Sequence, residues 1–183
     1  MSDELLILHC SPTLADLKVG NIFSCKCSCI IKLQQKLKSY NRLLNSKGIF
    51  LTLLSLKKDN ALIYMFRTKR LQQYMDSTEI KKFMKSYGYS NGSIYHYIKK
   101  LSHKLQTHDE FPHEIGIFLG YPLEDVKCFI KNEGRNCQCI GTWKAYHNLD
   151  DALKVFDSYK RCTKVYKDKL QSGTSFEDLV SGL

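Results

Sequence analysis

Apolar residues recur every three or four positions in several stretches of the chain, and this spacing is typical of amphipathic helices. In the stretch 30–44, one face carries Ile30, Leu33, Leu37, Tyr40 and Leu44. The same kind of pattern predicts helices over 70–75, 78–87, 93–106, 122–131 and 149–170. The last of these starts after Asn148, a typical N-cap residue, and carries acidic residues early and lysines late.

The N-terminus predicts two short helices that are separated at a proline. Asp3 to Cys10 is largely apolar, and Ser11 followed by Pro12 matches an N-cap and a first helical position. A second short helix is therefore expected to run from this point to Leu17.

Four segments have the composition of β-strands. They are 21–26, 49–56, 61–67 and 137–146. The turn residues Lys57 to Asn60 connect the second and third segments and predict a β-hairpin. Because strands and helices do not alternate regularly, we expect an α+β fold, in which helices cover a small, mostly antiparallel sheet of about four strands.

The length of 183 residues predicts a single domain over 1–183, with 173–183 as a short tail that is either helical or flexible. No apolar run approaches the roughly 18–20 residues that span a bilayer. The N-terminus, Met1 to Glu4, is acidic, unlike the start of a secretory signal. We therefore expect a cytoplasmic protein without a membrane partner, in which the eight cysteines are not paired in disulfides.

The chain is basic, with 28 lysines and arginines against 18 aspartates and glutamates, for a formal charge of +10. This charge favours anionic partners such as nucleic acid, acidic proteins, or phosphate and propionate groups. Near the C-terminus, Trp143, Tyr146, Tyr159 and Tyr166 are interleaved with basic residues, a pattern that suits a flat anionic ligand or single-stranded nucleic acid. Solvated lysines around an apolar helix face would give the same pattern.

Cys10 and His113 are the first candidates for chemistry. Placed just before a helix N-terminus, the Cys10 thiol would have a lowered pKa and could act as a nucleophile or metal ligand. His113 with Glu114 could form a general-base pair, or a ligand with a supporting carboxylate. The alternatives are a packed thiol at Cys10 and a Glu114 that binds the amides of its own helix.

The Cys-x-Cys pairs are candidate metal ligands. Cys137 and Cys139 could bind a metal together with Cys25, Cys27 or Cys29 if their strands were neighbours. Alternate residues of a strand lie roughly 6.6 Å apart, however. Thiolates on one zinc ion must be about 3.8 Å apart, so regular strands oppose such a site.

The chain resembles a family of small proteins from anaerobic bacteria that is catalogued as a domain of unknown function. The resemblance rests on the segments His9–Ala15, Phe111–Pro122, Gly141–Tyr146 and Tyr159–Thr163. Cys10, His113, Cys137 and Cys162 match the family's motifs, whereas Cys25, Cys27, Cys29 and Cys128 do not. The resemblance implies an association with flavodoxins and with iron uptake.

These observations predict an intracellular accessory protein of anaerobic iron, heme or redox metabolism. Its site would bind an iron-bearing or redox-active ligand such as heme, and its partner would be an acidic redox protein such as a flavodoxin. The residues expected to bind the cofactor are His9, Cys10, His113, Tyr121 and Trp143. One alternative is an enzyme in which Cys10 is the nucleophile and His113 and Glu114 are the base and its orienting group; the other is a nucleic-acid-binding module.

The central structural expectation concerns the segment Phe111–Pro122. We expect it to pack against Leu8–Leu14, because each is a short, apolar segment with a proline that must be held by tertiary contacts. This packing would bring Cys10 and His113 into one cleft.

Overall fold

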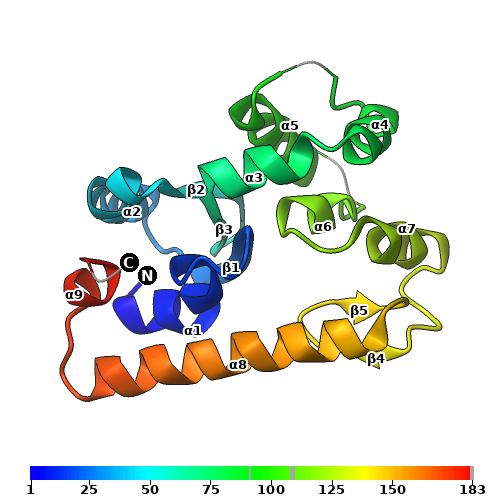
Figure 1. The fold of residues 1–183 in the computed structure, drawn as a ribbon. Coiled ribbons are helices and arrows are strands. Elements are labelled where there is room, and N and C mark those ends of the chain that lie inside the picture. Colours follow the sequence, from blue (N-terminus) through cyan, green and yellow to red (C-terminus); the bar gives the residue numbers. More distant parts are fainter. Residues whose placement is uncertain (91, 108–109, 182–183) are drawn as a thin grey trace.

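The computed structural model describes residues 1–90, 92–107 and 110–181, which form nine α-helices, one 3-10 helix and five strands (Figure 1). The N-terminal half contains α1 (Asp3–Leu14), β1 (Gly20–Lys26), α2 (Ile30–Leu44), η1 (Asn45–Lys47), β2 (Ile49–Lys57) and β3 (Asn60–Arg67). The remainder contains α3 (Thr68–Met75), α4 (Thr78–Ser86), α5 (Ile94–Thr107), α6 (Ile115–Phe118), α7 (Leu123–Lys131), β4 (Cys139–Ile140), β5 (Lys144–Ala145), α8 (Leu149–Gln171) and α9 (Phe176–Ser181). The α+β class is confirmed, and each helix predicted from apolar spacing is present.

The main sheet is antiparallel and has the strand order β1-β3-β2. β2 and β3 form the predicted hairpin, with Lys57 opposite Asn60, and a bulge shifts their register between Leu53 and Ser55. β1 pairs along the other edge of β3, from Gly20 opposite Phe66 to Lys26 opposite Asn60. The antiparallel sheet that the sequence predicts is therefore present with three strands.

The expected fourth strand, 137–146, does not join this sheet. It folds back on itself as the separate two-stranded ribbon β4–β5. Its turn lies directly on α8, where a Cβ added to Gly141 would be 2.2 Å from the Phe156 ring. The glycine therefore permits a close approach that turns the segment into a hairpin.

Helices cover both faces of the main sheet, and each face has its own apolar cluster. One face of β3 points Ala61, Ile63 and Met65 toward α1, α2 and α9. The other face points Leu62, Tyr64 and Phe66 toward α3 to α7. Burial on both faces explains why these strands have nearly continuous apolar sequences instead of alternating ones.

The expected helix restart at Pro12 is wrong, because α1 continues through Pro12 and ends at Leu14. The free carbonyls at the end of this helix are bound by a side chain from β3. The Arg67 guanidinium donates to the carbonyls of Thr13 at 2.6 Å and Leu14 at 2.5 Å. Cys10 therefore lies inside a helix and not in front of one.

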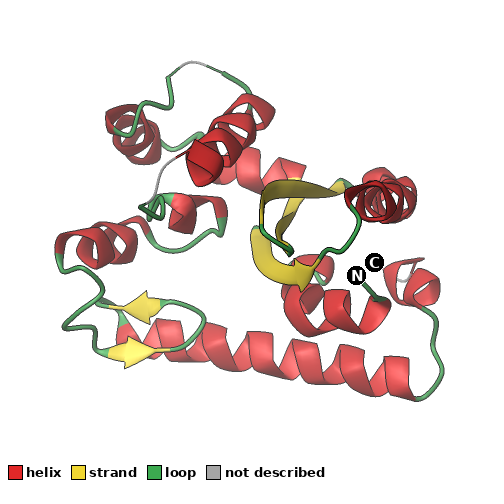
Figure 2. Ribbon diagram, turned by 180° about the vertical axis from the view of Figure 1, so that it is seen from behind, coloured by secondary structure: helices red, strands yellow, loops and turns green. Residues whose placement is uncertain are grey.

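The long helix α8 runs along one side of the molecule beneath α1 and the β4–β5 ribbon (Figures 1 and 2). The predicted tail after Gly173 turns back as α9, where Phe176 and Val180 are almost fully buried in the cluster with α1 and α2. The described part of the tail is therefore helical and packed; residues 182–183 lie outside the described residues. No helix in the described parts of the chain has the length and hydropathy needed to cross a membrane.

Candidate functional site

A pocket of about 350 Å³ lies between α6 with its preceding turn, α7 and the β4–β5 ribbon. Three of the predicted ligand-binding residues, His113, Tyr121 and Trp143, line it. Phe129 and Val126 of α7 add apolar surface. The Tyr121 and Trp143 rings are 5.3 Å apart at a tilt of 31°, and Trp143 meets Phe156 of α8 edge-on at 4.5 Å. The pocket is thus mainly aromatic.

The short helix α6 is fixed by contacts on two sides. A Cβ added to Gly116 would be 2.8 Å from Val126, so this glycine allows α6 to pack tightly on α7. On the other side, the buried Glu114 carboxylate accepts hydrogen bonds from Lys104 Nζ at 2.5 Å and from Tyr89 Oη at 3.2 Å. These contacts hold the turn that carries His113.

The ribbon is fixed to α7 by Asp125, whose carboxylate is 2% exposed. It accepts hydrogen bonds from Trp143 Nε1 at 2.7 Å, and from the backbone amides of Tyr146 at 2.9 Å and His147 at 3.0 Å. A buried carboxylate is stable when several donors satisfy it. Asp125 therefore sets the orientation of the Trp143 indole in the pocket.

The mouth of the pocket exposes both apolar and ionisable groups. Phe111 is 50% exposed and Ile140 is 72% exposed. The exposed His113 ring makes contacts with Phe111 and Phe129, and it forms no hydrogen bond within the described residues. Lys144 Nζ donates to the carbonyl of Gly134 at 2.8 Å and stays within the lining. A ligand here would meet one free imidazole and one ammonium group.

The expected shared site of Cys10 and His113 is not formed. Cys10 is fully buried in the cluster on the α1 face of the sheet, and burial raises the pKa of its thiol far above the ordinary value. His113 is exposed on the opposite side of the fold, next to the cluster around α6 and α7. Because a protonated, buried thiol is a poor nucleophile, the structure does not support an enzyme built on Cys10.

Two further predicted site residues, His9 and Glu114, do not line this pocket. His9 stacks on Phe23, with ring centroids 5.4 Å apart, and faces a groove between α1 and α8. Glu114 is bound by Lys104 and Tyr89, so its carboxylate is not paired with the His113 imidazole. The hydrogen bonds of Glu114 therefore connect the turn before α6 to α5 and to the loop between α4 and α5, and they do not orient a base.

The structure gives no support to a metal site at Cys137 and Cys139. All eight cysteines are free, and no three His, Cys, Asp or Glu side chains in the described ranges are arranged to hold a metal ion. Cys139 begins β4 of the ribbon, whereas Cys25 lies in β1 of the main sheet and Cys27 follows the last residue of that strand. The two Cys-x-Cys segments belong to different sheets, which removes the neighbouring strands that such a site required.

Several residues that shape this region were not predicted as site residues. In the sequence, Asp125 was only an acidic residue in the first turn of a predicted helix, and Phe129 gave no local signal. Lys144 was one of the basic residues interleaved with aromatic residues near the C-terminus, but that pattern did not place it in a pocket with His113. Cys128 Sγ lies 3.3 Å from His147 Nε2, a contact between α7 and the turn before α8 that sequence spacing could not show. Each of these contacts depends on how α7 and the ribbon pack.

Comparison with known proteins gives a family but no activity. Residues 6–180, nearly the whole chain from α1 to α9, match the model of a family described as a protein of unknown function, DUF3793. No curated protein and no solved structure matches the chain. The chain therefore belongs to the DUF3793 family.

Proposed function

We propose that this protein binds a planar, largely apolar ligand with negatively charged groups, the class that includes heme, in the pocket beside His113. The observation that carries the proposal is the convergence of His113, Tyr121 and Trp143 with Lys144 around one aromatic pocket. Concave, mainly apolar sites with a few polar groups are typical of small-molecule binding. The exposed Phe111 and Ile140 side chains add apolar surface that such a ligand would cover.

The chemistry of the lining fits heme in part. The aromatic rings suit a flat macrocycle, the free His113 imidazole is a suitable iron ligand, and Lys144 could pair with a propionate. The volume of about 350 Å³ is at the small end for ligand pockets, so a porphyrin would be enclosed only along one edge. Cys10 is fully buried and His9 does not line this pocket, so we assign the site without them.

This binding activity would suit an accessory protein in the cytoplasm, of the kind that the sequence resemblance implies for anaerobic iron, heme or redox metabolism. A bound heme would supply redox-active iron. An acidic partner such as a flavodoxin would be attracted by the charge of +10.

The test is a titration of the purified protein with hemin, followed by the Soret absorption band. We expect a saturable red shift in the wild type, loss of that shift in His113→Ala, and no change in His103→Ala, which removes an exposed histidine on α5. Protoporphyrin IX without iron should still bind to His113→Ala, because the ring contacts remain. Identical spectra for wild type and His113→Ala would exclude iron coordination by His113; the absence of any saturable change would contradict the ligand class.

A further inference from the structure

A second hollow, of about 680 Å³, lies between α1 and one face of α8. Its lining includes His9, Lys18, Asn21, Tyr159, Lys164 and Lys167. Gly141 and Thr142 line both this groove and the aromatic pocket, so the two hollows adjoin. The groove differs chemically from the aromatic pocket, because four lysines line it.

Lys18 is the unusual residue of this groove. It is 4% exposed, and its Nζ atom lies 5.1 Å from the centre of the Tyr121 ring and 5.8 Å from that of Tyr159. Across residues 1–90, 92–107 and 110–181, no carboxylate forms an ion pair with it. Burial lowers the pKa of Lys18 to about 8. A buried cation without a counter-ion is costly, and an anion in the groove would remove that cost.

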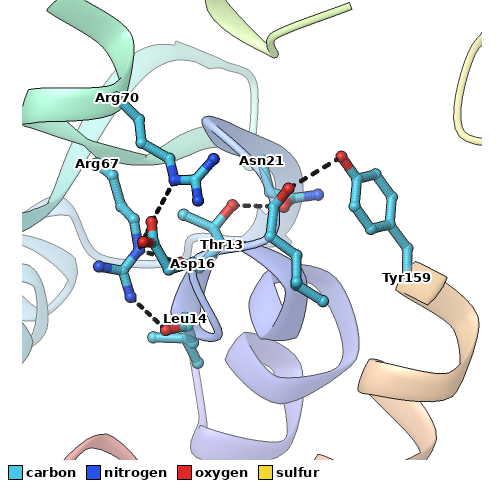
Figure 3. Close-up of polar contacts among 8 residues, drawn as sticks. Thr13, Leu14, Asp16, Asn21, Arg67, Arg70 and Tyr159 are labelled. Carbon is cyan, nitrogen blue, oxygen red and sulfur yellow. Dashed lines mark hydrogen bonds and ion pairs between the residues drawn. The ribbon is translucent and has the colours of Figure 1, made fainter. Parts of the chain in front are cut away.

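The loop that carries Lys18 is held in place from both sides (Figure 3). Asp16 forms ion pairs with Arg67, at 3.2 Å, and with Arg70. Tyr159 Oη donates to the carbonyl of Leu17 at 3.3 Å (Figure 3). A lysine fixed in this way loses little conformational freedom when it binds an anion, which favours affinity.

The outer part of the groove adds further positive charge. Lys160, Lys164 and Lys167 follow helical spacing along one face of α8, and none of them forms an ion pair within the described residues. Among the described residues, Asp168 is the one acidic side chain in the lining. Several cations around one anchoring lysine suit an anion with more than one negative charge, which favours phosphate over a single carboxylate.

Asn21 adds a neutral donor to the same lining. Its Oδ1 atom accepts a hydrogen bond from Thr13 Oγ1 at 2.7 Å (Figure 3), which leaves the amide nitrogen as a donor. A phosphate group takes hydrogen bonds from both ammonium and amide groups.

We infer that the groove between α1 and α8 is a binding site for a small phosphate-bearing ligand, with Lys18 as the anchoring cation. A small ligand fits better than a nucleic-acid strand, because a strand is held mainly by exposed cations along its backbone. Lys18 is instead buried between two tyrosine rings and lines the groove, from which one terminal anionic group could reach it. This groove adjoins the proposed heme-class pocket but would bind its ligand through other side chains, so either proposal can be correct without the other.

The test is isothermal titration of the protein with pyrophosphate at pH 7. Lys18→Met keeps the length of the buried side chain and removes its charge; we expect binding to weaken by about 10- to 100-fold, as for loss of a charge-assisted hydrogen bond. Lys164→Gln changes an exposed lysine of the groove and should weaken binding by a smaller factor. Lys169→Met, which removes an exposed lysine of α8 outside the groove lining, should leave binding unchanged.

Three results would overturn the inference. They are a wild-type protein that does not bind pyrophosphate, a Lys18→Met variant that binds as tightly as the wild type, and an equal loss in Lys18→Met and Lys169→Met. A single-stranded oligonucleotide that binds in a way that depends on Lys164 but not on Lys18 would also overturn it, and would identify a strand-binding surface. Circular dichroism of each variant confirms that the comparison is made on folded protein.

Discussion

At the scale of one residue, the buried charge of Lys18 lowers the free energy of unfolding, although the same charge would favour the binding of an anion. Between pH 8 and its ordinary value of 10.5, the unfolded chain holds a proton on Lys18 that the folded chain has released. Unfolding then takes up protons, so this residue makes the free energy of unfolding rise with pH across that window. Below pH 8 both states are protonated and the full cost of burial remains.

We therefore predict that Lys18→Met is more stable than the wild type at pH 7, by up to about 3 kcal/mol. The difference should shrink as the pH rises from 8 to 10.5, as the wild type loses its buried charge. Urea unfolding of both proteins at several pH values measures this, and their difference cancels the other groups that titrate there. A constant difference across the window would show that Lys18 is not the titrating residue.

Cys10 is buried as well, but here burial removes a function that the sequence predicted. Its sequence context predicted a reactive thiol, whereas its packing keeps the thiol protonated and inaccessible. We predict that a thiol reagent such as DTNB leaves Cys10 unmodified in the native protein and labels it only after unfolding. The half-buried Cys29, Cys128, Cys137 and Cys139 should react first. Mass spectrometry of the labelled peptides identifies the sites; rapid native labelling of Cys10 would contradict its burial.

At the scale of elements, Asp125 joins α7 to the β4–β5 ribbon and holds Trp143 in the pocket. In Asp125→Asn the new amide group faces hydrogen-bond donors, so at least one of them loses its acceptor. We predict a loss of about 1–3 kcal/mol in the free energy of unfolding, together with weaker ligand binding.

The matched control is Glu124→Gln, one residue earlier on the same helix, where the carboxylate is exposed and pairs with Lys127. It should change stability by less than about 0.5 kcal/mol. Chemical denaturation compares the two variants. Equal effects would mean that Asp125 acts only through its charge near the helix N-terminus.

At the scale of the whole molecule, local sequence patterns predicted most helices and strands correctly. They did not predict which of these elements contact one another. The apolar runs at 49–56 and 61–67 are strong because both faces of that hairpin are buried, and this is visible in the sequence. The ribbon at 137–146 could not be separated from a sheet strand, because its turn depends on the contact between Gly141 and Phe156 of α8. The hydrogen bonds of Asp125, the burial of Lys18 and the separation of Cys10 from His113 likewise arise from packing between distant segments.

His113, Tyr121 and Trp143 line one pocket, and the proposal that this pocket binds a ligand rests on that arrangement. Its most direct test is the fluorescence of Trp143, the sole tryptophan of the chain, during titration with protoporphyrin IX. We predict saturable quenching in the wild type and clearly weaker binding in Ile140→Asp, which places a negative charge at an exposed position of the pocket mouth without disturbing the core. Unchanged Trp143 fluorescence at saturating porphyrin, or equal quenching in both proteins, would contradict a binding site in this pocket.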